Sequence, residues 1–121
     1  MLWVAQARND HDAFTSAMAE RDVEVLELHD LLATTVADPK ACAWLLDRKL
    51  GRNYVDPETA TQLRPWLEGL SPAKLAERLI GGVTRSELPW DAVGLLARCA
   101  GPSDLLLPTI TNTLFSRDST C

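Results

Sequence analysis

The first stretch of the chain repeats one row of side chains every three or four residues: Val4, Ala7, His11, Phe14 and Met18. This spacing is typical of one face of a helix, so the pattern predicts an amphipathic helix from residue 2 to about residue 21. Residues 23–28 are short, β-branched and partly alternating. They predict a strand that leads into another helix through His29 and Asp30.

Three later helix starts are marked by the same pair of residue types. Asp38-Pro39, Asp56-Pro57 and Ser71-Pro72 each place a capping side chain before a proline at the first helical position. Apolar side chains follow each start at helical spacing. The sequence therefore predicts three short consecutive helices joined by short connections, which favours a compact bundle.

Glycine and proline predict where these helices end or bend. The helix that starts at Pro39 should stop at Gly51, because glycine tolerates the left-handed conformation after a helix C-terminus. Pro65 should kink or divide the helix that starts at Pro57, and Gly81-Gly82 should end the helix that starts at Pro72. We expect the apolar faces of these helices to bury four side chains against one another: Trp44, Leu67, Leu75 and Leu79.

The last quarter of the chain changes character. Residues 87–99 are ambiguous, and residues 90–99 could form one more helix. Residues 105–110 resemble a buried strand that leads into the stretch NTLFSRDST. The pattern thus predicts a mainly α fold, a bundle of short helices between two α/β pieces. A helix with one or two strands cannot cover both faces of a sheet, so a partner or a longer chain should complete it.

Composition narrows the function. The 121 residues include 46% hydrophobic side chains, enough for the core of one modest domain. A net charge of −5 disfavours binding to nucleic acid or to an anionic membrane. Three widely separated cysteines suggest neither a disulfide framework nor a metal site, and no signal peptide or membrane span is recognisable. We expect a soluble protein in the reducing cytoplasm.

Six blocks of the sequence, taken in order, resemble arginine deiminase: LWVAQARNDHDAF, VEVLELHDLL, WLLDRKL, KLAERLIGGV, LLLP and NTLFSRDST. The resemblance implies a five-bladed α/β propeller of the pentein type, interrupted by a helical domain. It assigns residues 1–30 to a helix and strand of the propeller and residues 31–98 to the helical insert. Residues 99–121 would then form a propeller strand and a substrate-site loop.

The resemblance also implies an activity, the hydrolysis of L-arginine to L-citrulline and ammonia. In this family a cysteine attacks the guanidinium carbon, aided by a histidine and by carboxylates, and no metal or organic cofactor takes part. L-arginine would be the substrate of the complete enzyme, which could be a homo-oligomer. Neither nucleic acid nor a membrane is an expected partner.

Three residues match substrate-binding positions of the family. Asp118 matches the aspartate that grips the guanidinium, and Phe115 matches an aromatic that packs against the substrate's aliphatic stem. Asn112 matches an asparagine near the α-carboxylate, although Thr111 stands where the family usually has proline. Each has a structural alternative: a solvated turn or cap for Asp118, a core position for Phe115, and a turn for Asn112.

The family's nucleophile is expected beyond this chain. Cys121 does not match it, and Cys42 and Cys99 are interpreted as small packing residues in helices. His11 and His29 lie in blocks that the family does not use for catalysis. The chain is therefore interpreted as part of an arginine deiminase, inactive alone. The alternative is a non-catalytic helical interaction module derived from such an enzyme.

Overall fold

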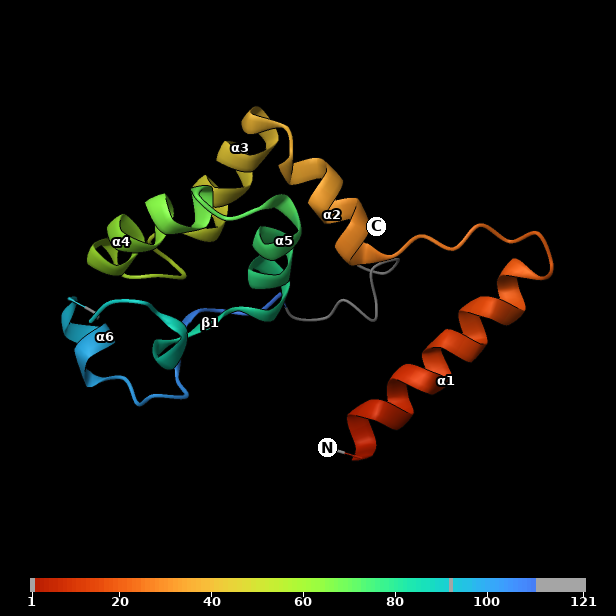
Figure 1. Ribbon diagram of the computed structural model, residues 1–121. Helices are drawn as coiled ribbons and strands as arrows, with labels where there is room; N and C mark the ends of the chain where they lie inside the picture. The colour runs from red at the N-terminus through yellow and green to blue at the C-terminus, as the bar shows by residue number, and fades with distance from the viewer. Residues whose placement is uncertain (1, 92, 111–121) are drawn as a thin grey trace.

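The computed structural model describes residues 2–91 and 93–110, and this part of the chain is mainly helical (Figure 1). Its elements, in chain order, are α1 (Leu2–Ala19), α2 (Leu28–Val36), α3 (Pro39–Lys49), α4 (Pro57–Glu68), α5 (Pro72–Gly81), β1 (Val83–Thr84), a 3₁₀ helix (Arg85–Glu87), α6 (Leu95–Cys99) and β2 (Leu105–Leu107). The predicted mainly α class and the long first helix are both confirmed.

The three marked helix starts are confirmed at Pro39, Pro57 and Pro72. The predicted capping role of the Ser71 side chain is wrong, because it makes no capping hydrogen bond to α5. The Asp38 carboxylate accepts a hydrogen bond from the backbone N–H of Lys40 at 3.1 Å. The Asp56 carboxylate accepts one from the backbone N–H of Thr59 at 3.0 Å. Each carboxylate satisfies a donor that the first turn of a helix leaves without a partner. The sequence thus positions α3 and α4 through local chemistry.

The hydrophobic core is formed by side chains of α2, α3, α4 and α5 together with the two strands β1 and β2. Its buried side chains are Val36, Leu46, Leu50, Val55, Leu63, Leu67, Leu75, Leu79, Val83 and Leu107. α2 packs against both α5 and α3. The predicted burial of Leu67, Leu75 and Leu79 is confirmed.

The predicted burial of Trp44 is wrong, because 55% of this residue is exposed. The next two residues of α3, Leu45 and Leu46, turn toward the core instead, and Leu46 is completely buried. Trp44 lies on the outer face of the helix, where the Arg48 guanidinium carbon sits 3.8 Å from its ring centroid. A four-residue step places these two side chains on the same face of a helix.

The strand predicted for residues 23–28 is also wrong. Residues 23–27 are irregular, and Leu28 already belongs to α2. A strand needs a partner for its backbone groups, and no strand among the described residues pairs with this segment. Figure 1 shows the segment as a long connection that leaves α1 apart from the other helices. Trp3 and Phe14 on α1 are accordingly 90% and 63% exposed.

The glycine and proline predictions met different outcomes. Pro65 does not divide α4, which runs through it to Glu68. α3 ends at Lys49 with Leu50 as its C-cap, so the predicted stop at Gly51 is confirmed. Gly51 does not use the left-handed conformation, since Gly82 is the glycine with positive φ among the described residues. Gly82, at φ 77°, ends α5 as predicted. A Cβ atom there would lie 2.5 Å from the Leu107 carbonyl oxygen, so only glycine fits.

β1 and β2 form a short antiparallel pair directly after α5. Val83 pairs with Leu107 and Thr84 with Leu105, with an irregularity in register between them. The predicted strand over residues 105–110 is confirmed at Leu105–Leu107, while its partner β1 was not predicted. Of the ambiguous stretch 87–99, the structure describes α6 at Leu95–Cys99. The β1–β2 pair lies shortly before the predicted substrate segment in the sequence.

Candidate functional site

The three predicted substrate residues, Asn112, Phe115 and Asp118, lie outside the described residues. The structure instead describes the chain that leads to them, residues 105–110, which we call the approach segment. The backbone N–H of Ile110 donates a hydrogen bond to the Ile80 carbonyl oxygen at 3.0 Å. Together with the β1–β2 pairing, this bond ties the approach segment to the C-terminal end of α5.

A charged cluster braces the turn that carries β1. The Glu87 carboxylate accepts hydrogen bonds from the backbone N–H and the hydroxyl of Thr84, both at 2.8 Å, and pairs with the Arg78 guanidinium on α5. The Thr84 N–H, the Arg78 guanidinium and the Thr84 hydroxyl lower the pKa of Glu87 to about 2. The three residues, which we call the Glu87 brace, connect α5 to the strand pair.

The 3₁₀ helix is also tied to the loop before β2. The backbone N–H of Arg85 donates to the Asp104 carbonyl oxygen at 3.0 Å, and the N–H of Ser86 donates to that of Pro102 at 2.9 Å. The Arg85 guanidinium donates to the carbonyl oxygens of Arg98 and Ala100. Sequence reasoning missed Arg85 and the Glu87 brace, because their partners are 9 to 19 residues distant or sit in turns without a periodic pattern.

An open cavity of about 450 Å³, which we call the approach pocket, lies between α3 and the approach segment. Its lining consists of Leu45, Arg48, Lys49, Tyr54, Pro108, Thr109 and Ile110. Burial lowers the pKa of the Lys49 ammonium. The pocket thus combines two cationic side chains with an apolar wall formed partly by residues that precede the predicted substrate segment in the sequence. The adjacent cations at the end of α3 were the only sequence signal for it.

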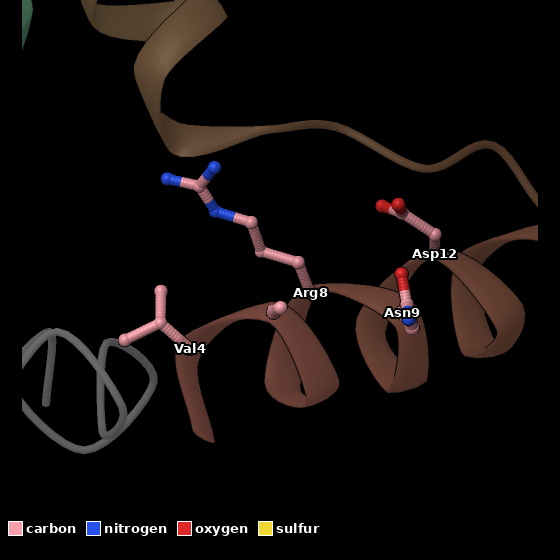
Figure 2. Close-up of a pocket in the computed structure, with 5 residues that line it drawn as sticks. Val4, Arg8, Asn9 and Asp12 are labelled. Carbon is pink, nitrogen blue, oxygen red and sulfur yellow. The ribbon is translucent and has the colours of Figure 1, made fainter. Parts of the chain in front are cut away.

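A second hollow, of about 560 Å³, lies along α1. Its lining residues, which include Val4, Arg8, Asn9 and Asp12, all belong to this one helix. Figure 2 shows Arg8 and Asp12 projecting from the same side of α1. Catalysis and selective binding require groups that converge from several directions. This hollow is therefore a surface of α1 and does not assemble a site.

The described cysteines and histidines do not form a catalytic pair. Cys42 on α3 is partly buried, and its pKa is raised first by burial and then by Glu68, against an opposing effect of Arg64. A raised pKa disfavours the nucleophilic thiolate. Cys99 is exposed at the end of α6, and His11 pairs with Glu27 at 2.9 Å. Across the described ranges, no hydrogen bond joins a cysteine to a histidine.

No group of three or more His, Cys, Asp or Glu side chains in residues 2–91 and 93–110 is arranged to hold a metal ion. In the same part of the chain, none of the helices has the length and apolar content that a membrane crossing requires.

The described residues define a mainly helical protein with one short strand pair, and the second strand of this pair precedes the stretch that begins at Asn112 in the sequence. The family model of arginine deiminase matches residues 1–121, the whole of this chain. The chain therefore belongs to the arginine deiminase family. The resemblance of the six sequence blocks is confirmed by this match.

Proposed function

We propose that this chain supplies part of the substrate pocket of an arginine deiminase, which hydrolyses L-arginine to L-citrulline and ammonia. The observation that carries the proposal is the family match over the whole chain, including the stretch NTLFSRDST. The approach segment supports it, because two sets of backbone hydrogen bonds anchor the chain immediately before that stretch. A loop that starts from a rigid anchor can hold binding residues in a defined position.

Each proposed substrate residue has a physical role. A guanidinium is planar and presents paired N–H donors, so the Asp118 carboxylate can bind it bidentately and offset the loss of hydration. The Phe115 ring packs against the aliphatic stem of arginine and excludes water from the reaction centre. The Asn112 amide donates a hydrogen bond to the α-carboxylate. Binding at both ends would orient the guanidinium carbon for attack.

We further propose that residues 31–98 form the helical insert of the enzyme, and that residues 1–30 and 99–121 belong to its propeller. α2 to α5 share one core, which supports an insert built from these helices, and Leu107 from the segment assigned to the propeller is buried in the same core. The exposed apolar side chains of α1, Trp3 and Phe14, support a role for this helix as one layer of a larger assembly.

The nucleophilic cysteine and its histidine are proposed to come from outside these 121 residues. For Cys42, the raised pKa supports this, because a thiol that resists ionisation is poorly suited to attack a guanidinium carbon. The reaction in this proposal uses no metal and no organic cofactor. The chain alone would then lack the group that forms the covalent intermediate.

Citrulline production tests the proposal. The purified 121-residue chain should form no citrulline from L-arginine above the uncatalysed background. A chimera in which this chain replaces the matching segment of an active arginine deiminase should form citrulline. The same chimera with its nucleophilic cysteine changed to alanine is the control. Turnover by the isolated chain that survives repeated purification would contradict the proposal, as would an inactive chimera that is correctly folded.

One observation favours a second candidate, a non-catalytic helical interaction module. The buried cluster from Val36 to Leu107 lies wholly within the chain, so the helices could fold without further segments. Size-exclusion chromatography and thermal melting of the isolated chain separate the two proposals. Cooperative unfolding of a monomer or dimer supports the module, whereas aggregation or a broad transition supports a piece that needs the rest of the enzyme.

A further inference from the structure

We propose that the approach pocket binds a small organic anion, a carboxylate with a short aliphatic body. The carboxylate would pair with Arg48 and Lys49, and the aliphatic body would lie against Leu45, Pro108 and Ile110. The cavity of about 450 Å³ falls within the size range of small-molecule pockets. This proposal does not depend on arginine hydrolysis.

The two cations supply the charge preference. Among the described residues, neither Arg48 nor Lys49 takes part in an ion pair, whereas Arg64 and Arg78 both do. The Arg48 guanidinium is held over the Trp44 ring, 3.8 Å from its centroid, which limits its conformational freedom but occupies only its face. Its N–H groups lie in the guanidinium plane and can donate in parallel to a carboxylate.

The Lys49 ammonium also favours an anionic ligand in the approach pocket. Burial lowers the pKa of this ammonium, because its charged form loses hydration in the pocket. A carboxylate placed beside it would compensate for that loss and raise the pKa. Binding of an anion should therefore shift the titration of Lys49 upward.

The walls of the pocket are held in place before any ligand binds. The backbone N–H groups of Tyr54 and Val55 both donate to the Gly51 carbonyl oxygen, at 2.9 and 3.2 Å. On the opposite side, the Ile110 N–H donates to the Ile80 carbonyl oxygen. A preformed pocket spares a ligand the entropic cost of ordering its walls.

The apolar lining selects an organic anion over an inorganic one. Leu45, Pro108 and Ile110 form an apolar wall that an inorganic phosphate has no apolar group to cover, so a phosphate would gain only the polar contacts with the cations and with the Tyr54 and Thr109 hydroxyls. A short branched carboxylate places its two oxygens on the cations and its methyl groups on the apolar wall. The Tyr54 side chain, at the rim and 67% exposed, can cover part of the aliphatic body.

Isovalerate tests the proposal, with 3-methylbutan-1-ol as a neutral analogue of similar shape and inorganic phosphate as a charged one. Titration of the active chimera, labelled in the segment that this chain supplies, should give saturable NMR shifts at Leu45, Tyr54 and Ile110 with isovalerate, with a Kd of about 1 mM for a ligand of this size. The alcohol and phosphate should each bind at least about tenfold more weakly. The Lys49 side-chain pKa should rise in the presence of isovalerate.

Substitutions complete the test. Arg48→Gln and Lys49→Gln should each weaken isovalerate binding about tenfold, the effect of losing one charge-assisted contact. Arg52→Gln removes a nearby exposed cation that does not line the pocket and should bind isovalerate like the unchanged chain. The proposal is overturned if phosphate binds as tightly as isovalerate, if the alcohol does, or if both pocket variants with native spectra bind normally.

Discussion

Replacing Glu87 with glutamine keeps the size of the side chain but removes its charge. The carboxylate of the Glu87 brace accepts two hydrogen bonds from Thr84 and pairs with Arg78. A pKa of about 2, against an ordinary value of 4.5, corresponds to roughly 3 kcal/mol at full strength. Because the side chain is 37% exposed, solvent screening reduces this value, and Glu87→Gln should cost about 1 to 2 kcal/mol at pH 7.

The pH dependence follows from the direction of the shift. A carboxylate whose folded pKa is depressed contributes stability above its unfolded pKa and loses it as pH falls through the folded pKa. The contribution of Glu87 should therefore be complete above about pH 5 and decline between pH 5 and pH 2. The difference in stability between the unchanged chain and Glu87→Gln should narrow over the same interval.

Urea unfolding of the active chimera, with and without Glu87→Gln, measures this difference by tryptophan fluorescence at a series of pH values. Glu77→Gln is the matched control, since Glu77 is an exposed residue of α5 and makes no side-chain hydrogen bond with the described residues. The control should change the free energy of unfolding by less than about 0.5 kcal/mol. The reasoning fails if Glu87→Gln behaves like the control at pH 7, or if its deficit is unchanged between pH 7 and pH 3.

Substitutions at three further positions test the helical part by the same urea assay. Leu63→Ala should lower the free energy of unfolding by about 2 to 5 kcal/mol, because Leu63 is completely buried. Trp44→Ala should lower it by less than about 1 kcal/mol, and equal losses for the two variants would contradict the core assignment. Asp56→Ala should cost about 1 kcal/mol through loss of the cap on α4, and Asp56→Asn should recover most of it; a cap without energetic value would leave both variants equal to the unchanged chain.

The helix starts could be predicted from the sequence because they depend on local chemistry. An aspartate before a proline satisfies a first-turn donor whatever the rest of the fold does, and Asp38 and Asp56 both do so. Burial was harder to predict. Trp44 lies beside two core leucines in the sequence, yet α3 turns it outward to Arg48. Hydrophobicity alone cannot decide which apolar residue of a helix faces the core.

Features that depend on distant partners could not be predicted. β1 has two residues, too few to show a period, and exists because Leu105–Leu107 pairs with it. Residues 23–28 have the composition of a strand, but no described strand pairs with them. For the candidate site, the match of Asn112, Phe115 and Asp118 to the family's substrate positions stays a prediction from their residue types. The anchoring of the chain before it, through Ile110 and Ile80, required the fold.

The most direct test of the proposed function is the effect of Asp118→Asn on kcat/KM for L-arginine, measured with the melting temperature in the active chimera. The amide would point donors at the donors of the guanidinium, and the lost charge-assisted contact should cost roughly 2 to 4 kcal/mol. The account therefore predicts a fall in kcat/KM of about a hundredfold or more, with little change in melting temperature. A lower melting temperature with nearly unchanged kcat/KM would contradict it and assign Asp118 a structural role.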